Sequence, residues 1–332
     1  MEVTMNDETQ LHVVFGAGQI GPLLAGELAR RGHRVRVVRR SSRPVEGFET
    51  RSGDATDPAF AVDAAAGASA LYHCMNPSSY TAKAWAAELP AMLEALIEAA
   101  VTHDARLVVL DNLYAYGVTD GPRTEETPTR AEGRKGQVRA RCAEALARAA
   151  EERGLRYVLG RAGDFFGEGA DQALVSPDAV RGLANGERPL LLGDPEAPHA
   201  FSYTRDVAQG LAALGDAELR EPVFHLPVHQ VAPAALYAML GRQLGVTPRP
   251  RVIRRWMLWL LWPFASLFRE LLETFYQWDR PFLADDARFR ARFPAVGVSL
   301  ERAVAQTVEG TTTVATGGSK PTSSQSAALP SA

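Results

Sequence analysis

Three glycines near the N-terminus stand at a spacing that suits phosphate binding. Gly16, Gly18 and Gly21 lie in the segment VVFGAGQIG, which passes from a buried apolar run into a helical one. The first glycine permits a tight turn, the second lets the backbone approach a pyrophosphate, and the third allows close packing of helix on strand. At the start of the helix, Gln19 and Ile20 lie where free N–H groups and the helix dipole favour phosphate. We therefore expect this loop to bind a dinucleotide.

Charged residues after the next two predicted strands bear on the identity of that dinucleotide. Arg39 and Arg40 end the second strand, where an NAD-selective site usually places an acidic residue on the ribose 2′-hydroxyl. Cations there suit a 2′-phosphate, although a solvated strand end also accounts for them. Asp54 follows the third strand and can accept a hydrogen bond from the adenine amino group, whereas Asp57 fits a helix cap. The sequence predicts NAD(P)H as cofactor, with NADP favoured.

Short apolar runs that alternate with helical runs must position these residues. Strands are predicted at 11–15, 33–40, up to residue 52, 68–74, 106–110 and 156–161, with helices at 19–32, 57–66, 80–102 and 134–153. Most of the strand runs are continuously apolar, which is typical of a parallel sheet covered by helices on both faces. We expect an α/β fold with a doubly wound Rossmann sheet.

The rhythm of the chain changes after about residue 170. The sequence predicts a dinucleotide-binding Rossmann domain over 1–170 and a smaller α/β substrate-binding lobe over 171–308, with segments around 200–227 returning to the core. From 309 to 332 the chain is rich in Ser, Thr, Gly and Ala. Because such a segment buries too little apolar surface to offset its ordering entropy, we expect a disordered tail.

Composition excludes several classes of function. The net charge of −3 provides no basic footprint, so we expect no nucleic-acid partner. Cys74 and Cys142 form no CxxC pattern and the seven histidines show no HExxH spacing, so no metal site is predicted. The polar N-terminus is not a secretory signal, which favours the cytoplasm. The sequence leaves the oligomeric state open, with a homodimer as one option.

The longest apolar run covers 256–268 and follows Arg254 and Arg255. It is too short to span a bilayer, and Pro263 interrupts it. A buried or substrate-facing helix is one interpretation, and an interfacial helix with peripheral membrane contact is the other. Aromatic and aliphatic residues continue to Trp278, and such a density suits an apolar pocket. The expected substrate is therefore a hydrophobic small molecule.

Several motifs together resemble the NAD-dependent epimerase/dehydratase family, in the extended or atypical group of short-chain dehydrogenases/reductases. They are FGAGQIG, GDATD, YHCMNP, LDNLYAYG, RAGDFFGEG and SYTRDVAQGL, and the likeness covers about residues 11 to 305. The resemblance implies a doubly wound sheet with a small C-terminal substrate domain. It also implies cofactor contacts at the glycine loop, at Arg39 and Arg40, at Asp54, and from Cys74 to Asn76.

The resemblance further implies a catalytic Ser or Thr, Tyr and Lys, and here the chain departs from the family. Asn112 stands where Ser or Thr is usual, and no tyrosine occurs between Tyr116 and Tyr157, so the YxxxK motif is missing. We predict Asn112, Tyr116 and Lys135 as catalytic residues instead, with Lys135 binding the nicotinamide ribose or steadying an oxyanion. On the predicted helix, Lys135 and Arg139 stand four apart and share one face.

The proton donor has further candidates. Tyr114, Tyr80 or an ordered water held by Asn112 would serve in place of Tyr116. The main hypothesis is an NAD(P)H-dependent reductase or dehydrogenase acting on a ketone or enone of a hydrophobic small molecule, with secondary metabolites among the candidates. One alternative is a non-catalytic NADP-binding sensor. Another is a nucleotide-sugar epimerase or dehydratase, which is least favoured because its oxidation half-reaction depends on a tyrosinate.

Overall fold

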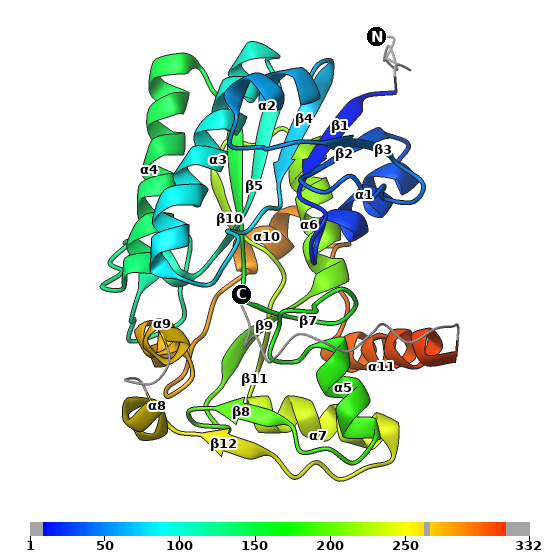
Figure 1. Cartoon of the computed structure of the whole chain (residues 1–332), viewed down its shortest axis with the longest axis vertical. Coiled ribbons are helices and arrows are strands. Elements are labelled where there is room, and N and C mark those ends of the chain that lie inside the picture. Colours follow the sequence, from blue (N-terminus) through cyan, green and yellow to red (C-terminus); the bar gives the residue numbers. More distant parts are fainter. Residues whose placement is uncertain (1–8, 262–265, 317–332) are drawn as a thin grey trace.

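A seven-stranded parallel sheet forms the centre of the larger half of the molecule (Figure 1). The structure, a computed structural model, describes residues 9–261 and 266–316. The strands follow the order β3 (Glu49–Ser52), β2 (Arg34–Arg39), β1 (Leu11–Phe15), β4 (Ala68–His73), β5 (Arg106–Asn112), β6 (Tyr157–Ala162) and β10 (Val223–His225). The strand order reverses between β1 and β4, so a crevice is expected there at the carboxyl ends of the strands.

Helices cover both faces of this sheet, as the continuously apolar strands predicted. On one face lie α2 (Pro58–Ala64), α3 (Ala82–Thr102) and α4 (Arg134–Arg153), and on the other α1 (Gly21–Arg30) and α6 (Thr204–Asp216). Along β1, Val13 and Phe15 pack toward the first group of helices, while Val14 packs toward the second. Each face of β1 is therefore buried, and the predicted Rossmann architecture is confirmed.

The smaller half lies below the sheet in Figure 1 and combines short strands with helices. A three-stranded sheet contains β11 (His229–Val231), β9 (His199–Tyr203) and β7 (Asp164–Phe166), and β12 (Arg251–Ile253) pairs with β8 (Leu190–Leu192). Its helices are α5 (Pro177–Ala184), α7 (Pro233–Leu244), α8 (Arg255–Leu261), α9 (Ser266–Thr274) and α11 (Leu300–Thr316), with the 3-10 turn η2 (Phe275–Gln277) after α9. Helix α10 (Ala287–Arg292) packs beside β10, and the 3-10 turn η1 (Tyr114–Tyr116) follows β5 and packs against α4. Helix α6 and strand β10 belong to the larger half.

The C-terminal segment differs from the expected tail. Residues 309–316 form the last turns of α11, and residues 317–332 lie outside the described residues. Thr307 and Thr311 are buried, and each hydroxyl donates a hydrogen bond to a backbone carbonyl of the preceding turn. These threonines are satisfied within a helix that packs against the smaller lobe, which composition alone did not reveal.

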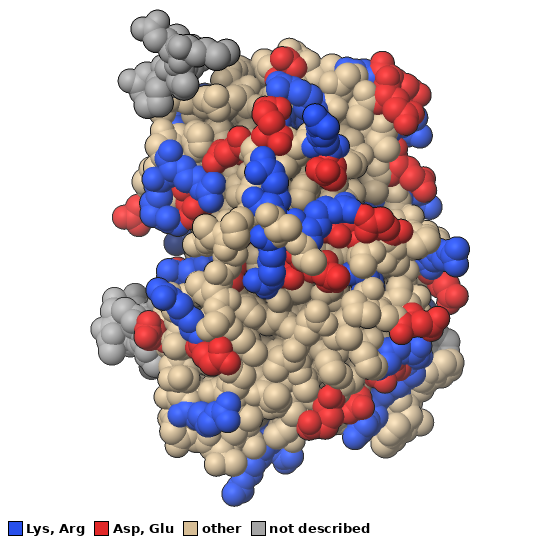
Figure 2. Space-filling model, turned by 180° about the vertical axis from the view of Figure 1, so that it is seen from behind, with Lys and Arg blue, Asp and Glu red and all other residues tan. Residues whose placement is uncertain are grey.

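The surface carries charges of both signs. On the face shown in Figure 2, acidic and basic side chains are interspersed, with a broad uncharged area over the middle of the lower half. No described helix is long and apolar enough to cross a membrane.

Candidate functional site

The glycine loop forms the turn between β1 and α1, and its geometry explains each glycine. Gly16 has a φ of +114°, and a Cβ there would lie 2.6 Å from the Cys74 carbonyl oxygen. A Cβ on Gly21 would lie 1.8 Å from the Gly16 carbonyl oxygen. A Cβ on Gly18 would meet nothing within 4 Å. The first and third glycines are thus required by the protein's own backbone, whereas the second leaves space that a phosphate can fill.

A cleft of about 530 Å³ opens over this loop at the carboxyl ends of the strands. It lies at the reversal of strand order, where open α/β sheets bind ligands. The predicted cofactor residues that line it are Gly16, Gly18, Gln19, Ile20, Arg39, Arg40, Asp54 and Asn76. Gly21 packs directly behind the loop, against Gly16. The structure therefore brings together, around one cleft, the cofactor-binding residues that were predicted from local sequence motifs.

The charges at the adenosine end of the cleft suit a phosphorylated ribose. Arg39 and Arg40 both line the cleft, and among the described residues no carboxylate forms an ion pair with either. Asp54 accepts hydrogen bonds from the Thr56 N–H at 2.9 Å and hydroxyl at 2.8 Å. These bonds, together with the charge of Arg40, hold the pKa of the Asp54 carboxyl below its usual value. Two arginines without a direct ion pair among the described residues thus stand in the cleft near the Asp54 carboxylate.

A second pocket adjoins the cleft, because Phe165 lines both. Its polar side chains come from Tyr80, Tyr114, Asp164, Thr274 and Gln277, and its apolar walls include Phe165, Leu174, Leu192, Phe201, Leu271 and Trp278. The cavity measures only about 20 Å³, room for about one water molecule. A molecule larger than water could enter only by displacing part of the wall, which α9 and η2 supply on one side.

Two phenols meet in this pocket. The hydroxyls of Tyr80 and Tyr114 lie 3.3 Å apart, and the Tyr80 hydroxyl also lies 3.0 Å from the Thr274 hydroxyl. Gln277 donates its side-chain N–H to the Tyr114 hydroxyl at 3.4 Å. Burial raises the pKa of both phenols above the ordinary value. Both therefore remain protonated near neutral pH and can donate a proton or hydrogen bond.

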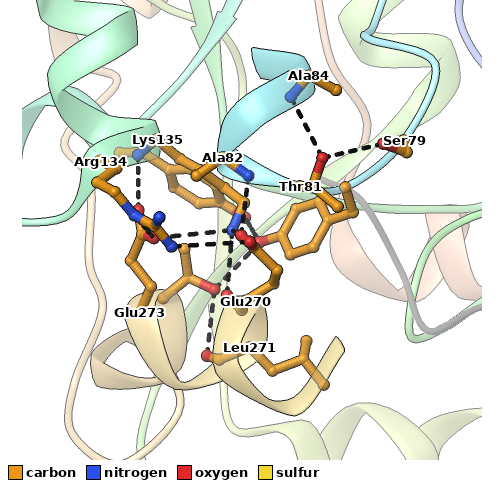
Figure 3. Close-up of polar contacts among 12 residues, drawn as sticks. Ser79, Thr81, Ala82, Ala84, Arg134, Lys135, Glu270, Leu271 and Glu273 are labelled. Carbon is orange, nitrogen blue, oxygen red and sulfur yellow. Dashed lines mark hydrogen bonds and ion pairs between the residues drawn. The ribbon is translucent and has the colours of Figure 1, made fainter. Parts of the chain in front are cut away.

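The side chain of Lys135 lies beside the two phenols, where two carboxylates of α9 form ion pairs with it (Figure 3). Its Nζ atom pairs with the Glu270 carboxylate, lies 3.1 Å from the Glu270 carbonyl oxygen, and stands 4.4 Å from the centroid of the Tyr80 ring. Glu273 accepts a hydrogen bond from the Lys135 backbone N–H at 2.6 Å. The Lys135 side chain is fully buried. The lysine thus faces the Tyr80 ring instead of the cofactor cleft.

The same carboxylates occupy the N-terminal ends of two helices. Glu270 accepts a hydrogen bond from the Ala82 N–H at the start of α3, and Glu273 does so at the start of α4 (Figure 3). Neither α3 nor α4 satisfies these N–H groups from within, and anionic groups are favoured at this end of a helix. Helix α9 is therefore fastened to the larger half of the molecule at the edge of the pocket.

The other two predicted catalytic residues lie elsewhere. The Tyr116 hydroxyl is 2.7 Å from Nε2 of His225, and its ring lies 4.6 Å from the Arg161 guanidinium. Asn112 accepts a hydrogen bond from the Tyr114 N–H at 3.1 Å. Neither lines the cleft or the adjoining pocket. The structure does not bring Asn112, Tyr116 and Lys135 together, and their catalytic roles stay predictions.

The sequence analysis did not predict that Arg139 contacts a residue that lines the cleft. Arg139 donates a hydrogen bond to the Asn76 side-chain oxygen at 3.5 Å and pairs with the buried Asp111 at 3.3 Å. Asp111 in turn binds Arg161 at 3.0 Å. The shared face of Lys135 and Arg139 was the available signal: Lys135 contacts Tyr80, which lines the pocket, and Arg139 contacts Asn76, which lines the cleft.

Comparisons with known proteins show that the chain matches one family model and shares its fold with solved structures. A model described as "NAD dependent epimerase/dehydratase family" matches residues 12–223. Among solved structures, the UDP-glucose 4-epimerase of Thermotoga maritima, with UDP-glucose, superposes with a TM-score of 0.76 at 19% identity, covering 92% of this chain and 100% of that one. The dTDP-glucose 4,6-dehydratase of Streptomyces venezuelae, with NAD, gives 0.73 at 18% identity, covering 91% and 96%. No curated protein matches. At these identities the structures show a shared fold.

Proposed function

Because the chain belongs to the NAD-dependent epimerase/dehydratase family, we propose that it is an NAD(P)H-dependent oxidoreductase that reduces the carbonyl group of a hydrophobic small molecule. The observation that carries this proposal is the buried pair of phenols, Tyr80 and Tyr114, in a pocket that shares Phe165 with the cofactor cleft. The residues of the cleft would hold the cofactor, which when bound would supply a hydride for the carbonyl carbon. The protein must then supply a proton to the carbonyl oxygen.

The protonation state of the phenols supports reduction over oxidation. Oxidising an alcohol needs a base, such as a tyrosinate, to accept the hydroxyl proton. Here burial raises the pKa of both Tyr80 and Tyr114. The nearby cation, Lys135, is compensated by Glu270 and lies against the ring of Tyr80. The pair is therefore suited to polarise a carbonyl and to donate the proton to the developing alkoxide, with Gln277 and Thr274 orienting the hydroxyls.

The cofactor preference is a separate part of the proposal. The family description and the dehydratase structure name NAD. Against this, Arg39 and Arg40 line the cleft without carboxylate partners among the described residues. Cations at this position suit a 2′-phosphate. We expect NADPH to bind more tightly than NADH.

The pocket walls support an apolar substrate with few polar groups. The polar lining side chains are the two phenols together with Asp164, Thr274 and Gln277, and the rest of the wall is aliphatic or aromatic. Asp164 lines the pocket, and no lysine or arginine among the described residues does. A diphosphate placed there would meet a carboxylate and no cation, which is unfavourable. A ketone or enone on a hydrophobic skeleton fits this environment better.

A nucleotide-sugar epimerase or dehydratase is the second candidate. It is favoured by the similarity over more than nine-tenths of the chain to structures with those activities. Cleft and pocket in this chain lack the tyrosine–lysine motif that the family uses for the oxidation step. This candidate therefore requires another base, and the Tyr80–Tyr114 pair is poorly suited to that role.

A turnover screen distinguishes these functions. Purified protein is titrated with NADPH and NADH by fluorescence, then incubated with a panel of hydrophobic ketones and enones and, separately, with UDP-glucose and dTDP-glucose. Consumption of NADPH with formation of an alcohol from a ketone, or of an allylic alcohol from an enone, supports the proposal. Conversion of the nucleotide sugars alone supports the second candidate. Tight cofactor binding without conversion of any compound supports a sensor.

A further inference from the structure

Helix α8 presents an apolar face to solvent at the lower edge of the smaller half, below α9 (Figure 1). Trp256, Trp259 and Leu260 are 60%, 61% and 65% exposed. Their spacing places them on one side of the helix. Leu258 is fully buried in the core of the lobe and anchors the opposite side. The helix is thus fixed to the protein while its large apolar side chains face outward.

Arginines precede this helix in the sequence, with no acidic residue among them. The segment 249–255 contains four arginines and no aspartate or glutamate. Arg249, Arg251 and Arg254 are exposed, and no carboxylate in the described part of the chain forms an ion pair with them. Arg255 is the exception, since it pairs with Asp279 at 2.8 Å. We refer to Trp256, Trp259, Leu260 and the three unpaired arginines together as the α8 patch.

We propose that the α8 patch docks on an anionic lipid surface. Indole rings are favoured at the boundary between headgroups and acyl chains, because one part of the ring is apolar and the N–H is polar. Arginines beside them are attracted to lipid phosphates and to the negative surface potential of anionic membranes. The combination is that of a helix lying in the plane of the interface.

A second copy of the chain suits the patch less well. A two-fold dimer places the same surface patch of each subunit against the other. The arginines around α8 would then face each other with few carboxylates nearby to compensate them. An anionic lipid surface complements both components of the patch, the apolar centre and the cationic edge.

Docking here has a consequence that rests on the proposed function. Helix α9 packs against α8, and α9 and η2 supply Leu271, Thr274 and Gln277 to the pocket beside the cofactor cleft. A docked α8 therefore places this wall of the pocket close to the membrane, where hydrophobic carbonyl compounds partition. Lipid binding itself does not depend on turnover, so its measurement tests the docking surface alone.

Vesicle co-sedimentation tests the proposal. The full chain is mixed with phosphatidylcholine vesicles and with vesicles of phosphatidylcholine and phosphatidylglycerol at low salt. We expect binding to the anionic vesicles that weakens at high salt, because exposed charges are screened. W256S/L260S and R251E/R254E should each lower the partition coefficient by about tenfold or more. The control R141E/R148E makes the same charge change at exposed sites on α4 and should bind nearly as wild type.

Circular dichroism and thermal unfolding of each variant show whether it is folded. Failure of the wild-type chain to sediment with anionic vesicles would overturn the proposal. Equal losses in R251E/R254E and R141E/R148E would also overturn it, since net charge would then explain the binding. Concentration-dependent dimerisation in light scattering, abolished by W256S/L260S in the absence of vesicle binding, would assign the patch to a protein contact.

Discussion

Lys135 of α4 and Glu270 of α9 form a buried ion pair that joins the two halves of the molecule beside the proposed substrate pocket. The lysine contributes its charge to a site that Tyr80, Glu273 and the start of α3 surround. Because both groups are removed from water, each is compensated mainly by the other, with Glu273 lying 4.0 Å from the lysine and Arg134 lying 3.7 Å from Glu270. The pair fastens α9, which also forms part of the pocket wall, to the Rossmann half.

Removing one member of this ion pair should lower the free energy of unfolding strongly, and removing both members should lower it much less. E270Q keeps a side-chain acceptor for the Ala82 N–H but leaves the buried Lys135 charge with the more distant carboxylate of Glu273, at 4.0 Å. We expect E270Q to lower the free energy of unfolding by about 3 kcal/mol. K135M/E270Q should recover most of this loss, since no unpaired charge remains. Urea unfolding of the two variants and of K135M measures the coupling. Additive losses in the double variant would show that the two side chains do not depend on each other.

Removing a phenolic hydroxyl from the pocket should slow reduction without preventing cofactor binding. Y114F and Y80F should lower kcat, the more important donor by about 10²-fold or more, because a general acid contributes about that much. Y72F is the matched control, a buried tyrosine whose hydroxyl binds His12 at 2.9 Å. Steady-state kinetics with an identified ketone provides the measurement. A larger loss in Y116F than in Y114F and Y80F would instead support the sequence prediction for Tyr116.

Neutralising the two arginines of the cleft should change the cofactor preference. R39A/R40A should weaken NADPH binding by about tenfold to a hundredfold and leave NADH nearly unchanged, because charge-assisted hydrogen bonds to a phosphate are lost. R43A removes an exposed arginine three residues further on that does not line the cleft, and it should leave both affinities unchanged. Fluorescence titration gives the two Kd values for each variant. Equal weakening of NADPH and NADH would exclude a specific role at the 2′-phosphate.

Acid should destabilise the fold through three buried histidines. Burial lowers the pKa of His12 and His225 to about 4 and that of His73 to about 3. In the unfolded chain these imidazoles have a pKa of about 6.5, so the unfolded state binds protons first as the pH falls. Stability is therefore complete above about pH 6.5 and decreases toward pH 4, by about 1.4 kcal/mol per pH unit for each proton taken up.

Urea unfolding at a series of pH values measures this slope. H225Q should reduce the slope by about one proton relative to the wild type. H103Q is the control, because His103 is only partly buried at the C-terminal end of α3. A wild-type free energy of unfolding that stays constant between pH 6.5 and 4 would show that these histidines are accessible to protons in the folded chain.

The sequence by itself determined the Rossmann sheet and the residues around the cofactor cleft. Both depend on local signals, namely the periodicity of apolar residues and the spacing of glycines between a strand and a helix. Because parallel strands end at one edge of the sheet, Gly18, Arg40, Asp54 and Asn76 had to converge once the strands were recognised.

Only the tertiary structure decided what lies beside that cleft. Tyr80, Tyr114, Asp164 and Gln277 come from four separated segments, and no local pattern records their meeting. Glu270, the partner of Lys135, is 135 residues distant in the chain. Such contacts arise when the smaller lobe docks on the sheet, which depends on long-range packing. Because the YxxxK motif is missing, the position of a possible proton donor follows only from the tertiary fold.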